Sequence, residues 1–259
     1  MLFYERLVPL NRDAHATLKV RGGGFGYAAR TNSSPLLAAE MVDAARCYPI
    51  LFVDIGQSQV FPIALLGLRV AENLFVVPGG GGWEEGAYVP AFVRRYPFVL
   101  TSDMTVCIDE AFAGFDHDEG EPLFDESGGN APALEQAVTF LRGFHDEAER
   151  TRALVAELQE RALLKPVSLN VAPADGSDAY RIDGLQTIDE EALAALSGEA
   201  VMSLFRSGAL AAVYAQQVSL KGLDELNRRT GARATATPAQ TEAEAGGQVS
   251  GAVATLVEG

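Results

Sequence analysis

The central stretch of the chain, residues 81–98, concentrates the side chains that most often bind other molecules. It holds the only tryptophan, two tyrosines, two phenylalanines and an adjacent pair of arginines. An arginine beside aromatic rings either pairs with internal carboxylates and carbonyls or binds an anionic group of a ligand. Aromatic and arginine side chains are also the usual anchors of protein interfaces. The stretch is therefore either a structural core cluster or a partner-binding surface, and its candidate binding residues are Trp83, Tyr88, Arg94, Arg95 and Tyr96.

The catalytic motifs that are readable in a single sequence do not identify an enzyme. The chain contains neither a Gly-x-Ser-x-Gly nucleophile elbow, nor a phosphate-binding loop, nor a His-Glu-x-x-His pair. The glycines Gly24 and Gly26, with Ala29, formally fit the dinucleotide-binding fingerprint. A turn-rich loop follows them, however, where the pyrophosphate requires the N-terminus of a helix. We expect these glycines to serve a hairpin or a surface loop, and we assign no catalytic residue and no cofactor.

The acidic segment Asp103–Glu126 invites a metal-site interpretation, because all of its charged residues are acidic. The spacing of Asp116, Asp118 and Gly120 resembles the start of a calcium-binding EF-hand loop. The glycine falls one position early, and Ser127 occupies the position of the bidentate glutamate. The three histidines of the chain form no close-spaced pair. We therefore expect a solvated acidic loop and assign no metal site.

Charge and hydropathy limit the classes of partner. A formal net charge of −15 and a pI near 4.6 make nucleic acids and anionic lipid surfaces poor partners, which leaves a small molecule, a peptide or a protein. No apolar run approaches the roughly 20 residues of a transmembrane helix. The N-terminus shows no secretory signal pattern. We expect a cytoplasmic protein without an integral membrane segment, in which Cys47 and Cys107 are buried thiols.

Strand-like runs dominate the first half of the chain. Ile50–Ile55 and Gln59–Leu68 are rich in β-branched and aromatic residues, and the turn-like residues between them predict a hairpin. Ser34 followed by Pro35 has the pattern of an N-cap and a first helical residue, which predicts a helix to about Arg46. Further strands are expected at Tyr4–Leu10, His15–Arg21, Asn73–Val77, Phe98–Thr101 and Met104–Asp109.

A long amphipathic helix opens the second half. Apolar residues recur at spacings of three, four or seven from Leu134 to Ala162. A helix of about 30 residues is about 45 Å long, so it should contact both the sheet and the C-terminal helices. Thr187 and Glu190 form a capping-box pattern that predicts a helix start. Gln217 is the polar residue in the apolar stripe of the last helix, which indicates either a buried polar contact or a partner surface. The other expected elements are a hairpin of Val167–Val171 and Ala179–Leu185, and helices at Glu199–Arg206 and Ala209–Arg229.

These patterns predict an α+β fold. A mainly antiparallel β-sheet in the N-terminal half should pack against the long amphipathic helix, with a β-hairpin and a C-terminal helical part following. We expect a single domain over residues 1–229, with a β-rich half (1–126) and a helix-rich half (127–229). After it, the composition shifts to Ala, Thr, Gly, Glu, Gln and Pro without aromatic residues, which predicts a disordered tail over residues 230–259. The apolar patch Val253–Val257 within this tail suggests a docking or export signal.

Several segments resemble the bacterial SapC family. Tyr88–Phe98 is similar to the signature of the family, and the resemblance extends in order from Tyr4 to about Arg229. Through the family name it implies a link to surface-layer proteins and serum resistance, and it implies no catalytic residue. A permease for antimicrobial peptides has the same name, but the short apolar runs of this chain exclude that identity. The other similar segments are Tyr48–Phe52, Leu65–Arg69 with Glu72–Phe75, and Cys107–Glu110.

Two functions of different classes remain. The first is a non-enzymatic binding or accessory protein, linked to the handling of surface-layer or cell-surface proteins, that recognises a peptide or protein partner. The alternative is an enzyme, or a substrate-presenting subunit of a modifying enzyme. Its small-molecule or metal site would lie where the central aromatic stretch meets the acidic loop. Both leave open a homo-oligomer and an association with the cell surface.

Overall fold

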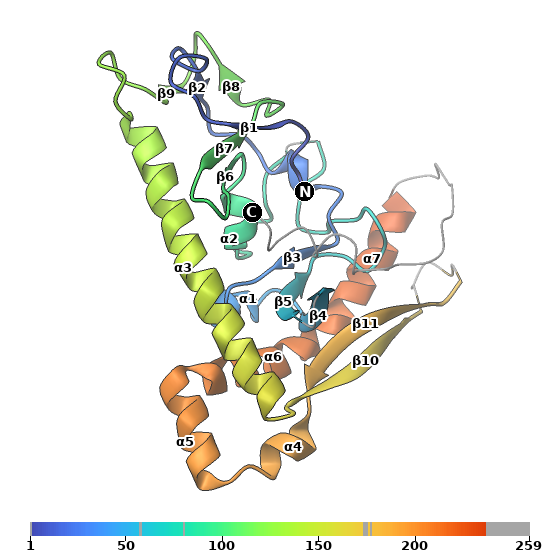
Figure 1. Cartoon of the computed structure of the whole chain (residues 1–259). Coiled ribbons are helices and arrows are strands. Elements are labelled where there is room, and N and C mark those ends of the chain that lie inside the picture. The colour runs from blue at the N-terminus through green and yellow to red at the C-terminus, as the bar shows by residue number, and fades with distance from the viewer. Residues whose placement is uncertain (1, 57–58, 80, 173–175, 177, 237–259) are drawn as a thin grey trace.

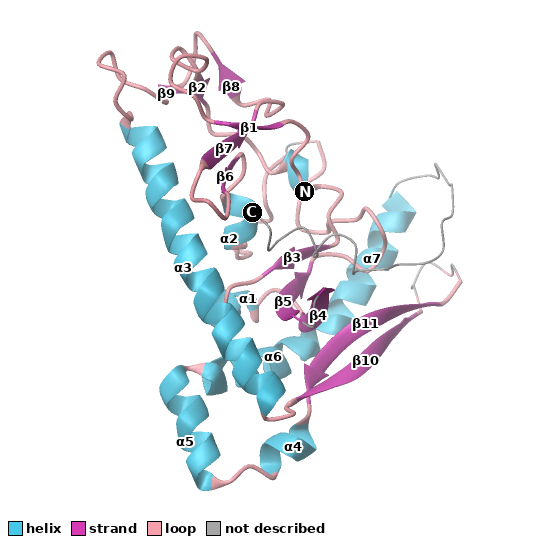
Figure 2. Ribbon diagram, in the orientation of Figure 1, coloured by secondary structure: helices cyan, strands magenta, loops and turns pink. Residues whose placement is uncertain are grey.

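The computed structural model describes residues 2–56, 59–79, 81–172, 176 and 178–236 (Figure 1). Within these residues the chain forms three antiparallel sheets and a set of helices, one of which is much longer than the others (Figure 2). The predicted α+β class is confirmed. No helix in this part of the chain combines the length and the apolar composition that crossing a membrane requires.

The largest sheet contains strands from both halves of the chain. Its order is β10 (Leu164–Val171), β11 (Tyr180–Ile188), β4 (Ile50–Gly56), β5 (Gln59–Leu65) and β3 (Ser33–Pro35). The two predicted hairpins, β4–β5 and β10–β11, are confirmed. Val53 of β4 pairs with Leu185 of β11, so the second hairpin extends the sheet that the first one begins.

Two smaller sheets lie together at one end of the molecule (Figure 1). One has the order β1 (Leu7–Pro9), β7 (Val106–Asp109) and β6 (Phe98–Leu100), and the other β8 (Phe115–Asp116), β2 (Lys19–Val20) and β9 (Glu121–Pro122). The acidic segment therefore supplies β7, β8 and β9. The predicted strand at Asn73–Val77 is wrong, because only Val76 is bridged there, to Trp83.

The long helix α3 (Pro132–Glu160) connects these regions (Figure 1). Its 29 residues span about 43 Å at 1.5 Å per residue. Leu134 and Leu141 are buried in one core with the sheet of β6 and β7, whereas Val155 and Leu158 are buried in a second core with the five-stranded sheet and α6 (Ala209–Ser219). The helix also holds the segment before α1 in place, because the Thr151 hydroxyl accepts the Ala38 N–H at 2.8 Å. The predicted contacts of the helix with the sheet and with the C-terminal helices are thus confirmed.

The predicted helix from Ser34 to Arg46 is wrong in its first half. Ser33–Pro35 form β3 and pair with residues 63–65 of β5, which places them in the buried interior of the sheet region. Only a 3₁₀ turn, η2 (Ala38–Glu40), and the four-residue helix α1 (Met41–Ala44) follow. The serine–proline pattern is local, and pairing with a neighbouring strand overrides it.

The predicted capping box is also wrong. Thr187 is still part of β11, where it pairs with Lys165, and the side chain of Asp189 caps α4 (Glu190–Ala194) by accepting the backbone N–H groups of Glu191 and Ala192. The buried amide of α6 belongs to Gln216 rather than to Gln217. Its Nε2 donates to the Ile50 carbonyl at 3.1 Å and to the Thr187 hydroxyl at 3.0 Å, which ties α6 to the sheet.

The C-terminal helices are α5 (Gly198–Ser207), α6 and α7 (Leu223–Ala236), with a 3₁₀ turn, η3 (Leu220–Gly222), before α7. Helix α7 continues beyond Arg229, after which we predicted a disordered tail, and Thr230 is fully buried. Residues 230–236 are therefore helical. The rest of the predicted tail, with Val253–Val257, lies outside the described residues. Both cysteines are free thiols; Cys107 is buried and Cys47 half-buried.

Candidate functional site

The adjacent arginines of the central stretch have opposite environments. Arg94 is the last residue of the short helix α2 (Ala91–Arg94) and Arg95 is its C-cap, while Ala91, Phe92 and Val93 of the helix are all buried. Because successive residues of a helix point about 100° apart, Arg94 projects into solvent while Arg95 turns into the protein. The stretch is thus both core and surface, and each arginine needs a separate account.

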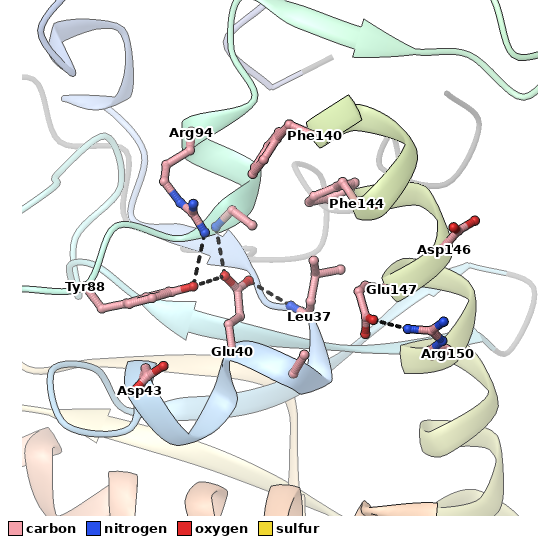
Figure 3. A pocket seen from close by; sticks show the side chains of 13 residues that line it. Leu37, Glu40, Asp43, Tyr88, Arg94, Phe140, Phe144, Asp146, Glu147 and Arg150 are labelled. Carbon is pink, nitrogen blue, oxygen red and sulfur yellow. Dashed lines mark hydrogen bonds and ion pairs between the residues drawn. The ribbon is translucent and has the colours of Figure 1, made fainter. Parts of the chain in front are cut away.

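Arg94 is exposed but held in a defined position (Figure 3). Its Nε donates to the Val89 carbonyl at 3.1 Å and its Nη2 donates to the Tyr88 hydroxyl at 3.2 Å. The guanidinium lies over the Phe140 ring of α3, with 5.3 Å from Cζ to the ring centroid, a favourable cation–π distance. These contacts restrict the side chain before any ligand arrives.

Beneath Arg94, the buried carboxylate of Glu40 organises the surrounding loops. It accepts the Tyr88 hydroxyl at 2.8 Å, the Ala91 N–H at 2.9 Å and the Leu37 N–H at 2.8 Å. Burial raises the pKa of Glu40, because desolvation outweighs these hydrogen bonds. Burial and the neighbouring Glu40 carboxylate raise the pKa of Tyr88 to about 12. Sequence reasoning missed Glu40, although an acid within an apolar run, between Leu36 and Met41, was the available signal.

A cavity of about 400 Å³ opens in front of this cluster. In Figure 3, Glu40 and Tyr88 form one side of it, and Phe140 and Phe144 of α3 face them. Charged side chains stand at its α3 side, where Glu147 and Arg150 form an ion pair. The cavity thus combines an aromatic wall with a fixed guanidinium.

A second cavity, of about 890 Å³, shares two lining residues, Arg94 and Phe140, with the first. Arg95 lines this larger cavity and is only 7% exposed. Its Cζ lies 4.1 Å from the centroid of the Phe92 ring and 4.9 Å from that of Phe144. Its buried Nε has no hydrogen-bond acceptor among the described residues.

Tyr96 lines the same large cavity and is fixed at both ends. Its ring stacks on that of Tyr27, with 4.1 Å between centroids, and its hydroxyl donates to Asp109 at 3.0 Å. Asp109 is fully buried, which by itself would raise its pKa. The N–H groups of Glu5 and Arg6 also donate to this carboxylate, and the hydrogen bonds together hold the pKa of Asp109 below its usual value.

Trp83 lies apart from the other four predicted residues. It is half-buried, its Nε1 donates to the Tyr48 hydroxyl at 2.9 Å, and its ring meets the Phe25 ring edge-on at 5.5 Å. It lines neither of the two cavities. The structure therefore brings Tyr88, Arg94, Arg95 and Tyr96 to one pair of cavities. Their role in binding stays a prediction.

Two glycine runs pack against each other beside the large cavity. A Cβ atom on Gly24 would lie 2.6 Å from the Gly81 carbonyl oxygen, closer than real Cβ atoms approach. A Cβ atom on Gly23 would lie 2.8 Å from the Phe112 ring, and both Gly23 and Phe112 line the cavity. The loop that contains Gly22–Gly26 thus needs glycine for close packing.

The acidic loop uses its carboxylates within the loop and on basic side chains of the N-terminal segment, where Glu110 forms an ion pair with Arg6 at 2.9 Å. Asp116 accepts the N–H groups of Asp118 and Glu119, and Arg21 forms ion pairs with Asp116 at 3.4 Å and Glu119 at 3.0 Å. Among the residues that the structure describes, no three His, Cys, Asp or Glu side chains converge as metal ligands do.

Comparison with known proteins gives one match. The family model described as SapC matches residues 10–226, which include α3, both cavities and every strand of the three sheets except β1. No curated protein and no solved structure matches the chain.

Proposed function

Because the chain belongs to the SapC family, we propose that it is a non-enzymatic binding or accessory protein that recognises a peptide or protein partner. The partner would be a surface-layer or other cell-surface protein, which the chain meets in the cytoplasm. The observation that carries this proposal is the exposed but fixed guanidinium of Arg94, a residue that lines both cavities.

The position of Arg94 lowers the cost of binding. An arginine on a free surface loses rotamer entropy when it contacts a partner, at about 0.5–1.5 kcal/mol for each immobilised side chain. Arg94 already has two hydrogen-bond acceptors and the Phe140 ring below it. Arginine and aromatic residues that are held in this way are typical of interface hot spots. A partner would place a carboxylate or carbonyl on Arg94 and an apolar side chain between Phe140 and Phe144.

Affinity capture tests the proposal. Three tagged full-length proteins are expressed in the native bacterium: the wild type, the Arg94→Ala variant and an Arg228→Ala control. The proteins captured with each are compared by quantitative mass spectrometry. Arg228 is a suitable control because it is also exposed and lies on α7, with Glu225 as its ion-pair partner. Wild type and control should capture the same surface protein, and Arg94→Ala at least tenfold less.

The same partner recovered equally with Arg94→Ala would remove the proposed recognition surface. Melting curves of the three proteins must coincide, since an unfolded variant would mimic a lost contact. Cell fractionation, with the tagged protein in the soluble fraction as the expected result, tests the proposed location.

A second candidate function has a specific observation in its favour. The large cavity is lined both by the central stretch, through Arg95 and Tyr96, and by the acidic segment, through Phe112 and Glu121. This is the place where an enzyme or a substrate-presenting subunit would hold a small molecule. Native mass spectrometry of the purified protein tests it, and a small molecule retained at a stoichiometry near one would favour this function.

A further inference from the structure

The burial of Arg95 lacks its usual compensation. A buried charge is costly unless an opposite charge and hydrogen bonds offset its desolvation. Arg95 forms no ion pair with a described carboxylate, and its Nε–H is buried without an acceptor. The group that interacts with its guanidinium is the Tyr4 hydroxyl, which is neutral at physiological pH because burial raises the pKa of Tyr4 to about 12. The rings of Phe92 and Phe144 contact the guanidinium through their π faces, and such faces do not replace an in-plane acceptor for the N–H groups.

The cavity beside Arg95 carries more positive than negative groups. Three arginines line it, Arg21, Arg94 and Arg95, against one acid, Glu121. Arg21 is already paired with Asp116 and Glu119 of the acidic loop. Arg94 acts on the Glu40 carboxylate, to which the Tyr88 hydroxyl links it, whereas Arg95 has no carboxylate partner among the described residues, in a chain whose net charge is −15. Screening limits the repulsion from distant acids to about 8 Å at physiological salt, so the local arginines determine which charge the cavity accepts.

The remaining wall of the cavity is aromatic and apolar. Tyr27 and Tyr96 present a stacked pair, and Phe112 meets the Tyr96 ring edge-on at 5.3 Å. Phe140 closes the side formed by α3. Such a wall suits an aromatic or aliphatic group. A guanidinium at its end suits a planar carboxylate, which accepts two parallel N–H bonds from arginine.

We propose that the large cavity binds a carboxylate attached to an apolar or aromatic group, with Arg95 as the buried counter-ion. The carboxylate pairs with the guanidinium of Arg95, and the attached group packs against Tyr27, Tyr96 and Phe112. This inference rests on the proposed binding function and specifies the chemistry that the partner presents. The same chemistry occurs at the C-terminus of a peptide that ends in an apolar residue and in a free organic acid.

The test compares two molecules that differ only in the charged group. N-acetyl-phenylalanine and N-acetyl-phenylalanine amide are titrated into the full-length wild-type protein, and binding is followed by calorimetry or by ligand-observed NMR. The acid should bind at least tenfold more tightly than the amide. Equal binding of the two, or binding of neither, would overturn the proposal. This comparison needs no variant, so it stands even if a change at Arg95 disturbs folding.

Two further arms assign the residue and the source. The Arg95→Met variant keeps an unbranched side chain against the phenylalanine rings but lacks the guanidinium. It should bind the acid at least tenfold more weakly than the wild type. An unchanged affinity of the folded variant would overturn the assignment to Arg95. Arg228→Met is the matched control and should bind as wild type. An N-acetylated Ala-Ala-Phe peptide binding more tightly than N-acetyl-phenylalanine would identify a peptide C-terminus as the source. Weaker binding of this peptide would identify a free acid.

The two proposals can fail separately. If Arg94→Ala abolishes partner capture while the acid and the amide bind equally, the proposed carboxylate site is refuted and the proposed binding function is supported. If the acid binds through Arg95 but no partner depends on Arg94, the cavity is a small-molecule site and the accessory function falls.

Discussion

At the scale of single residues, position within one helical turn decides what each member of the arginine pair can do. Arg94 has carbonyl, hydroxyl and ring contacts at the surface, while Arg95 is enclosed by Phe92 and Phe144. The sequence singled out both arginines because their type is informative. It did not separate them, since the difference comes from packing against α3, about 50 residues later in the chain.

A substitution of Glu40 should weaken the hydrogen bonds at the rim of the smaller cavity more than a substitution of any other lining residue. In Glu40→Gln the amide replaces one acceptor oxygen by a donor, so at least one of the three hydrogen bonds from Tyr88, Ala91 and Leu37 is lost. A buried donor without an acceptor costs about 1–3 kcal/mol. Urea denaturation should show a decrease of this size in the free energy of unfolding. A stability equal to that of wild type would contradict the hydrogen-bond arrangement.

The pH dependence of this effect has a definite sign. Burial raises the pKa of Glu40 above its ordinary value of 4.5, so over an interval above that pH the folded protein keeps a proton that the unfolded chain has lost. The associated stability is fully present below pH 4.5 and is lost as the pH rises through the folded pKa. The stability advantage of wild type over Glu40→Gln should therefore shrink as the pH rises above 4.5. An advantage that grows with pH would show that the carboxylate is favoured in its ionised form.

At the scale of elements, local sequence patterns predicted correctly the helices and hairpins that form between neighbouring residues. They predicted the wrong element where a segment pairs with residues far away in the sequence. The long helix and the two hairpins could be predicted, because their periodicity and turns are local. The signals at Ser34–Pro35 and Thr187 gave the wrong element, because β3 pairs with β5 and Thr187 remains in the ladder with Lys165. Glu40 and Asp109 were missed for the same reason, since their partners lie far along the chain.

The contact between the two glycine runs predicts a sharp difference between neighbouring positions. In Gly24→Ala the new Cβ would lie 2.6 Å from the Gly81 carbonyl oxygen, which is backbone and cannot rotate away. Overpacking of this kind costs about 1–3 kcal/mol. Gly22→Ala is the control, because nothing lies within 4 Å of its Cβ. Thermal denaturation should show a lower melting temperature for Gly24→Ala alone, and equal melting temperatures would refute the close packing.

At the scale of the whole molecule, the C-terminal helix contacts both the start of the central stretch and the loop that precedes it. Arg229 of α7 forms an ion pair with Glu84 at 2.5 Å, and Arg233 donates to the carbonyls of Asn73 and Val76. Composition alone placed the end of the domain at residue 229. It could not detect these contacts, because a helix rich in Ala, Thr and Gly owes its order to what it touches rather than to its own propensity.

Truncation tests this role of α7. A chain ending at Ala236 keeps the bonds of Arg233 and the buried Thr230, whereas a chain ending at Arg229 loses both. Hydrogen bonds of charged groups contribute about 1.5–3 kcal/mol each. Urea denaturation should therefore give the shorter chain a free energy of unfolding that is lower than that of the longer chain by at least the contribution of one such bond. Equal stability of the two chains would place the end of the domain at Arg229 after all.

The pairing of β11 with β4 also affects how the protein is made. Strand β4 leaves the ribosome about 130 residues before β11, which at about 5–20 residues per second is a delay of roughly ten seconds. During that interval one edge of β4 has unpaired backbone groups and can pair with other strands. Nascent chains that stall after β4 and before β11 should depend on chaperones more than chains that stall elsewhere. The speed of synthesis through α3, which lies between these strands, should influence the yield of folded protein.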